Sequence, residues 1–246
     1  MNILYQIPGD VSAGPLGRSE LERRRGLLSG WASPGVAIDV ADAPGGPLSI
    51  EGHAEEALCV PPMIAAVRRR GPAPDAIVIG CFGDPGLAAL REITDGPVVG
   101  PFEASMHVAM QLGDRVGVLT ILDSVVPVLD HLVRGMGLSL RYAGAAAIDV
   151  PVLELKDRRD EVEGRVAAAA AGMMRDRGAG VLILGCMSLS FLGVAERTAA
   201  AAGIPVINPA RCALKTAEAL VAQGLSQSRR TYAKPRKEIA TVEDVR

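Results

Sequence analysis

Short runs of apolar, β-forming residues alternate along this chain with longer stretches whose apolar positions recur at helical spacing. The runs are NILYQI, VAIDVA, DAIVIG, PVVG, RVGVLTI, SLRYAGA, VLILG and PVIN, in that order. DAIVIG and VLILG lack polar alternation, so each should be buried on both faces of a sheet. A repeated strand–helix order predicts parallel sheets with right-handed crossovers.

The pattern contains an internal repeat. IVIGCFGDPGL (Ile77–Leu87) and LILGCMSLSFL (Leu182–Leu192) both place Gly-Cys at the end of an apolar strand. PVVGP and PVINP follow at similar distances, and each leads into an Ala-rich helix. The repeat predicts an α/β protein of two pseudo-symmetric, Rossmann-like lobes with parallel sheets and the active site in the cleft between them.

The expected boundaries make the first lobe discontinuous. A helix over 210–223 should cross back, so that residues 1–100 and 208–246 form the first lobe and residues 101–207 the second. Pro61-Pro62 should break or restart a helix over 49–70. Asp84-Pro85 fits the N-cap and first position of the next helix. The basic tail from Ser226 has no clear periodicity and should be solvated.

Composition and charge exclude several classes of function. The chain has 49% hydrophobic and 22% charged residues and a net charge of −2. It therefore has no charge bias toward nucleic acid or an anionic membrane. The N-terminal residues do not resemble a signal peptide, and no apolar run reaches the ~18 residues of a membrane span. We expect a cytoplasmic protein with reduced cysteines.

The sequence also predicts no metal site and no cofactor. The four cysteines include no C-x-x-C pair, and the three histidines are scattered, which argues against zinc. No Gly-rich phosphate loop or G-x-G-x-x-G occurs. Cys59 and Cys212 lie in apolar helical stretches and are expected in the core.

Cys81 and Cys186 are the candidate catalytic residues. Both should lie at the carboxyl ends of parallel strands, where α/β sheets bind ligands, with helix N-termini that favour thiolate and anionic groups. Two thiols facing one carbon from opposite sides could remove its proton on one face and deliver a proton on the other. The alternative is that each cysteine is a small buried core residue, but the repeat favours the functional interpretation.

Several motifs resemble the aspartate/glutamate/hydantoin racemase superfamily, and its hydantoin racemase branch in particular. They are GCFGDPGL, GPLSIE with EEAL, PVVGPFEA and the C-terminal PVINPARCALKTAEALVAQGLSQS. The resemblance implies a two-lobed fold, a mechanism independent of pyridoxal phosphate with Cys81 and Cys186 as the catalytic pair, and a homo-oligomer. The chain departs from the family pattern at YQIPGDVS, where family members often have a strand ending in Asn-Pro-Asn-Thr. The second cysteine motif, GCMSLSF, also differs from the commoner Gly-Cys-Ala-Gly type.

Six further residues are candidate substrate contacts: Gln6, Phe82, Gly83, Thr120, Met187 and Ser188. Gln6 is a polar substitute for the missing Asn. The Thr120 hydroxyl either binds a substrate oxygen or belongs to an ordinary strand end. Phe82 and Met187 either line the pocket or fill the core, and Ser188 either caps a helix or donates to substrate.

The sequence therefore predicts a racemase or epimerase that acts at an acidic carbon beside a carbonyl. Its small-molecule substrate should be anionic or contain an imide, as a hydantoin-type or amino acid-derived compound does. A hydantoin ring carbon is more acidic than the α-carbon of a free amino acid, so it demands less of two thiols. The alternatives are a decarboxylase or isomerase of the same superfamily, and an accessory protein that binds a ligand without turnover.

Overall fold

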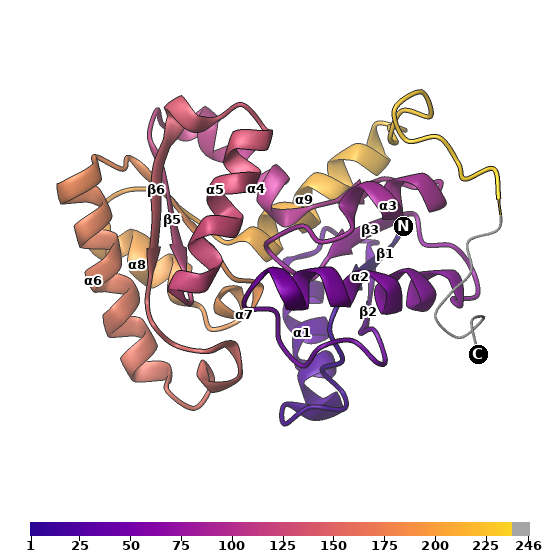
Figure 1. Ribbon diagram of the computed structural model, residues 1–246, viewed down its shortest axis with the longest axis horizontal. Helices are drawn as coiled ribbons and strands as arrows, with labels where there is room; N and C mark the ends of the chain where they lie inside the picture. Colours follow the sequence, from indigo (N-terminus) through magenta and orange to yellow (C-terminus); the bar gives the residue numbers. More distant parts are fainter. Residues whose placement is uncertain (238–246) are drawn as a thin grey trace. The chain divides into compact units, whose positions relative to one another are not determined.

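A computed structural model describes residues 1–237 of the chain, which divides into two compact units. Unit 1 comprises Met1–Ile50, Ala54–Pro101 and the chain from Ala213 onward. Unit 2 comprises Glu51–His53 and Phe102–Cys212. Figure 1 follows the chain through both units by colour.

Unit 1 is built on a parallel sheet with the strand order β2-β1-β3-β4. Its elements are β1 (Asn2–Gln6), α1 (Gly17–Trp31), β2 (Ala37–Ala41), α2 (His53–Arg68), β3 (Ala76–Ile79), α3 (Leu87–Ile93) and β4 (Val98–Val99). Helices α2 and α3 cover one face of this sheet, because Met63 and Leu90 share a core cluster with Leu4, Ile77 and Ile79. Every residue of β3 is buried, as expected for a central parallel strand.

Unit 2 repeats this plan with the strand order β6-β5-β7-β8. Its elements are α4 (Pro101–Leu112), β5 (Val116–Thr120), α5 (Val126–Gly135), β6 (Tyr142–Ala147), α6 (Arg159–Arg177), β7 (Val181–Leu184), α7 (Met187–Ser190), α8 (Val194–Ala202) and β8 (Val206–Ile207), with short 3-10 turns at Asp123–Val125, Ser139–Arg141 and Val152–Glu154. Helix α6 packs on β5 and β6 and against α8 (Figure 1). Val166 and Val194 from these helices share a core cluster with Leu119 and Leu184.

The two sheets correspond strand for strand. The first strand of each unit is central, the second lies at one edge, the third is central again, and the fourth lies at the other edge. Cys81 directly follows Gly80 at the end of β3, and Cys186 directly follows Gly185 at the end of its counterpart β7. The predicted fold class, an α/β protein with two parallel sheets, is confirmed.

The predicted break at Pro61-Pro62 is wrong, because α2 runs without interruption through both prolines. Proline lacks the N–H that would bond to the carbonyl four residues earlier. Those carbonyls belong to Ala57 and Leu58, which are exposed, so water can satisfy them. Met63, which is fully buried, fixes the helix on the sheet one residue later.

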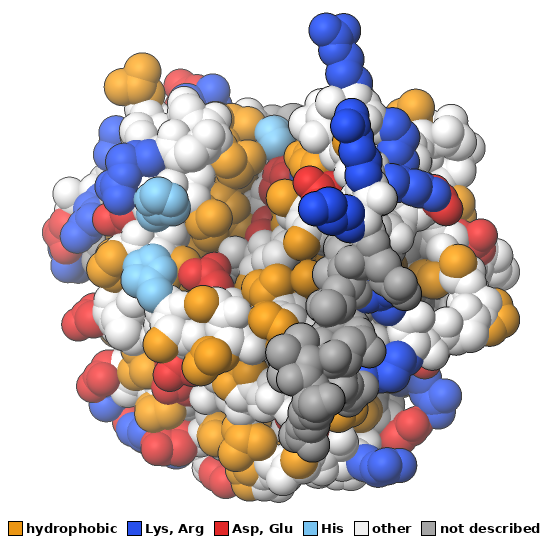
Figure 2. Space-filling view, turned by 45° about the vertical axis from the view of Figure 1, so that its right-hand side comes forward, with side chains coloured by type: hydrophobic (Ala, Val, Ile, Leu, Met, Phe, Trp, Pro, Cys, Tyr) orange, Lys and Arg blue, Asp and Glu red, His pale blue; other side chains and the backbone are white. Residues whose placement is uncertain are grey.

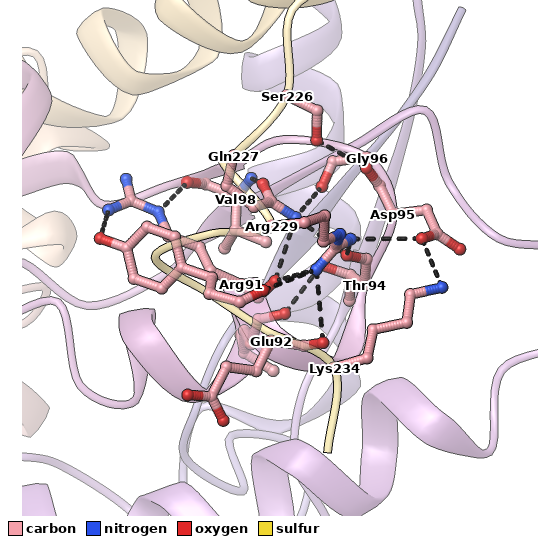
Figure 3. A network of polar contacts seen from close by, with 12 residues as sticks. Arg91, Glu92, Thr94, Asp95, Gly96, Val98, Ser226, Gln227, Arg229 and Lys234 are labelled. Atoms are coloured by element: carbon pink, nitrogen blue, oxygen red, sulfur yellow. Dashed lines mark hydrogen bonds and ion pairs between the residues drawn. The ribbon is translucent and has the colours of Figure 1, made fainter. Parts of the chain in front are cut away.

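A C-terminal strap, residues 226–237, lies along the edge of the unit 1 sheet (Figure 3). The side-chain oxygen of Gln227 accepts a hydrogen bond from the amide of Val98 in the edge strand β4, at 3.3 Å. The carbonyl of Val98 accepts another from Nε of Arg91, at 3.1 Å. The strap thus covers edge groups that would otherwise be open to pairing with another chain.

The strap is anchored mainly by Arg229. Its guanidinium donates to the carbonyls of Arg91 (2.9 Å), Glu92 (3.4 Å) and Thr94 at the end of α3. The Tyr232 ring lies 5.3 Å from the Arg91 guanidinium, which also donates to its hydroxyl. Most other strap side chains stay exposed, and Figure 2 shows Lys and Arg side chains gathered in its upper right part.

Helix α9 (Pro209–Ala222) passes from unit 2 into unit 1. The Glu218 carboxylate accepts hydrogen bonds from the amide (3.0 Å) and hydroxyl (2.6 Å) of Ser33, just beyond α1, and from Lys215 (2.8 Å). Burial raises the pKa of Glu218, but these donors outweigh burial and hold it below its ordinary value. This contact ties the C-terminal part of α9 to the N-terminal part of unit 1.

Candidate active site

Each candidate cysteine is fixed by a glycine that bonds to the neighbouring central strand. The amide of Gly80 donates to the carbonyl of Gln6 at 2.7 Å, and the amide of Gly185 donates to the carbonyl of Leu119 at 2.6 Å. Gln6 and Leu119 therefore occupy equivalent positions in β1 and β5. The next residues along, Ile7 and Thr120, are equivalent by the same register.

Both glycines are required by close packing. A Cβ on Gly80 would lie 2.9 Å from Tyr5 and Ile7 and 3.1 Å from the carbonyl oxygen of Gln6. A Cβ on Gly185 would meet the three counterparts of these residues: Val118 at 2.7 Å, and the Leu119 oxygen and Thr120 Cβ at 3.1 Å. The two cysteines are thus presented by the same local geometry, and only glycine fits before them.

The chain after the two cysteines differs between the units. Cys81 enters a turn closed by a hydrogen bond from the Asp84 amide to its carbonyl (3.2 Å), and α3 begins only at Leu87. Gly86, in the left-handed conformation, is the N-cap, so the prediction that Asp84 and Pro85 start this helix is wrong. The physical reason is the fit of Gly86 beneath α2, since a Cβ on this residue would lie 2.9 Å from the Met63 side chain. Cys186, by contrast, is itself the N-cap residue of α7.

Gln6 ends β1 and is fully buried. Its side-chain nitrogen donates to the carbonyl of Ile7 at 3.0 Å. Its side-chain oxygen has no hydrogen-bond partner among the described residues. A buried acceptor without a donor is costly, so this oxygen is suited to receive an N–H from a ligand.

Thr120, the other predicted residue of a central strand, ends β5 and is also fully buried. Its hydroxyl donates to the carbonyl of Gly185 over a long 3.5 Å. The hydroxyl therefore lies beside the backbone that presents Cys186. Its role toward substrate stays a prediction.

The residues that follow the cysteines divide by burial. Phe82 and Met187 are each only 3% exposed, whereas Gly83 and Ser188 are half-buried. A carboxylate oxygen of Glu56 lies 3.1 Å from the position of a Cβ on Gly83, so a negative charge borders the Cys81 turn. Gln6, Cys81, Phe82 and Gly83 belong to unit 1, and Thr120, Cys186, Met187 and Ser188 to unit 2.

Sequence reasoning gave no role in the site to two polar residues near the segments that follow Cys81 and Cys186. The Asp84 carboxylate lies against Gly100, and Asn208 donates from its side chain to the carbonyl of Ser190 at 3.0 Å. Ser190, at the end of α7, is 1% exposed, and its hydroxyl has no partner among the described residues. The signal that could have found Asn208 is the alignment of PVVGP with PVINP, which sets it opposite Gly100.

The other two cysteines have different surroundings. Cys59 is fully buried in α2, and burial together with the nearby charge of Glu56 raises the pKa of its thiol to about 12. Cys212 is half-buried in α9. Over residues 1–237 no group of three His, Cys, Asp or Glu side chains is arranged to hold a metal ion. Within the same range no helix has the length and apolar character to cross a bilayer.

A family model described as Asp/Glu/Hydantoin racemase matches residues 25–217. A hydantoin racemase from Rhizobium meliloti is 40% identical to the chain over 192 residues, which cover 77% of this chain and 79% of that protein. A second, from Paenarthrobacter aurescens, is 36% identical and covers 82% of this chain and 86% of its own length. The crystal structure of an allantoin racemase from Pseudomonas fluorescens matches 98% of this chain and 99% of its own, with a TM-score of 0.90 and 31% identity.

Proposed function

Because the chain belongs to the Asp/Glu/hydantoin racemase family, and is a racemase, we propose that it inverts a 5-substituted hydantoin-type ring with two thiols and no cofactor. The observation that carries this proposal is the repeated presentation of Cys81 and Cys186. Each follows a glycine that is bonded to, and tightly packed on, the central strand of its own sheet. A core cysteine would not require the same backbone geometry twice.

In the proposed reaction one cysteine is a thiolate and the other a thiol. The thiolate takes the proton from the ring carbon, and the C–H electron pair moves onto the adjacent carbonyl as an enolate. The opposite thiol then delivers its proton to the other face of the carbon. The enantiomer leaves with the charge moved from one sulfur to the other, and the reverse reaction exchanges the roles.

The surroundings of the cysteines support a ring with N–H groups over a free amino acid. Among residues 1–237 no donor reaches the buried side-chain oxygen of Gln6, and Glu56 adds negative charge beside Gly83. An imide or ureide N–H would donate to the Gln6 oxygen, and a neutral ring would avoid repulsion by the Glu56 carboxylate. The relatives that act on hydantoins and allantoin, by their names, point to the same class of substrate.

The test is exchange and racemisation in D₂O. Each enantiomer of a 5-substituted hydantoin, of allantoin and of glutamate is incubated with enzyme, and loss of optical rotation is followed with deuterium incorporation by proton NMR. We expect both signals with the cyclic substrates, and their loss in Cys81→Ala and in Cys186→Ala. Cys212→Ala is the matched control and should retain activity. Exchange in neither enantiomer of any substrate would favour an accessory protein, and carbon dioxide release from a malonate-type substrate would favour a decarboxylase.

A further inference from the structure

The residue that follows the fourth strand occupies the same register in both units. Val78 pairs with Val99 in unit 1, and Ile183 pairs with Ile207 in unit 2. Cys81 and Cys186 each lie three residues after the first member of the pair. Gly100 and Asn208 each lie one residue after the second. The two positions are therefore equivalent relative to the cysteines.

In unit 2 a side chain at this position ties α7, the short helix after Cys186, to the end of β8. Asn208 is 8% exposed, and its amide nitrogen donates to the carbonyl of Ser190 at 3.0 Å. Its side-chain oxygen accepts from the amide of Arg211 at 3.1 Å, which caps α9. Ser190 ends the short helix that starts directly after Cys186. Asn208 therefore links the end of α7 to the first turn of α9.

In unit 1 the same position is Gly100, which has no side chain. The space is occupied by the carboxylate of Asp84, because a Cβ on Gly100 would overlap its Oδ2 and Cγ. Asp84 belongs to the Cys81 turn and holds a left-handed backbone conformation, with φ of 52°. That conformation is uncommon for a residue other than glycine, and aspartate adopts it more readily than most.

We propose that Asp84 and Asn208 are positioning residues for the thiols of Cys81 and Cys186. Each fills the same place between a cysteine loop and the end of the fourth strand. The polar group comes from the loop in unit 1 and from the strand end in unit 2. The catalytic part of this inference rests on the proposed two-thiol racemase, whereas the structural part does not.

A thiol-labelling experiment tests the structural part without substrate. Wild type, Asp84→Gly and Asn208→Ala are alkylated with iodoacetamide under native conditions, and each cysteine is followed by peptide mass spectrometry. Loosening one loop should speed alkylation of its own cysteine about threefold or more through local opening and leave the other unchanged. Asp84→Gly should act on Cys81, and Asn208→Ala on Cys186. Equal acceleration of both cysteines in each variant, or of neither, would overturn the proposal.

A swap variant separates positioning from general loss of stability. Asp84→Gly with Gly100→Asn gives unit 1 the arrangement of unit 2, with the polar group moved from the loop to the strand end. We expect it to return Cys81 alkylation toward the wild-type rate, whereas Gly100→Asn alone should clash with the Asp84 carboxylate. Unfolding temperatures are measured in parallel. A swap that restores the unfolding temperature but not the Cys81 rate would contradict a positioning role.

Kinetics with a substrate deuterated at the reacting carbon test the catalytic part. Asp84→Gly should lower kcat more than it raises KM. It should increase the primary isotope effect for the enantiomer whose proton Cys81 removes and decrease it for the other. Asn208→Ala should show the opposite pattern. Equal effects on both enantiomers would refute positioning of individual thiols, whereas labelling that follows the prediction in a protein without racemase activity would refute only the proposed function.

Discussion

Gly80 and Gly185 offer the most direct test of how the cysteines are presented. Ordinary van der Waals contact begins near 3.4 Å, so an alanine Cβ would intrude by about 0.5 Å (3.4 − 2.9) at Gly80 and about 0.7 Å (3.4 − 2.7) at Gly185. The atoms it meets include the backbone of a central strand, which cannot rotate away. Overpacking of this kind costs about 1–3 kcal/mol.

We expect each alanine variant to have a lower unfolding temperature than wild type and a reduced kcat. For a chain of this size each kcal/mol corresponds to ~2–4 °C, so Gly80→Ala and Gly185→Ala should each unfold roughly 2–12 °C below wild type. A cysteine displaced by a fraction of an ångström to 1 Å should lose up to ~100-fold in kcat for racemisation. Differential scanning calorimetry and polarimetry measure the two effects.

Matched controls come from the same units. Gly26 in α1 and Gly164 in α6 are exposed, and a Cβ on either would meet no atom of the described part of the chain within 4 Å. Alanine at an open helical site should stabilise by roughly 0.5–1 kcal/mol and leave kcat unchanged. If Gly80→Ala behaved like Gly26→Ala in both assays, the account of the glycine–cysteine geometry would be refuted.

Three other predictions concern the strap, the α9 contact and the thiol of α2. Arg229→Ala should destabilise unit 1 by about 1–3 kcal/mol, because its guanidinium serves three carbonyls at the end of α3, whereas Lys234→Ala, at a solvated pair with Asp95, should not measurably change the unfolding temperature. The pKa of Glu218 is lowered in the folded state, so its stabilisation is present above 4.5 and is lost as pH falls through the folded-state value. Denaturant unfolding of Glu218→Gln should therefore vary less with pH in acid than wild type, and equal slopes would contradict this. Cys59, with a pKa raised to about 12, should resist iodoacetamide at pH 8 under conditions in which Cys212 reacts. Comparable labelling of the two cysteines, followed by mass spectrometry, would contradict the raised pKa of Cys59.

The sequence predicts the strands well because they are apolar runs bounded by turn residues. DAIVIG and VLILG became β3 and β7, both completely buried. The alignment of their Gly-Cys ends also predicted two lobes of similar topology, and the two sheets have matching strand orders. Local patterns suffice here, since a buried parallel strand must be apolar throughout.

Features that depend on contacts between distant residues were not predictable in this way. Pro61-Pro62 does not break α2, because exposure of the freed carbonyls and the burial of Met63 outweigh the local preference. Gly86 displaces Asp84 from the N-cap because Gly86 fits beneath α2. The place of the Asp84 carboxylate depends on the absence of a side chain at Gly100, which only the fold brings near.

The return of α9 and the strap to unit 1 has a consequence for synthesis on the ribosome. Unit 1 needs residues from Ala213 onward, and the 111 residues of 102–212 are translated before them. At ~5–20 residues per second this delay lasts about 6–22 s. During that time the nascent β4 lacks the glutamine that covers its edge, and Ser33 lacks its carboxylate partner. Unit 2 needs no residue beyond Cys212 and can form first, so the half of the protein that is made earlier should be the one that matures last.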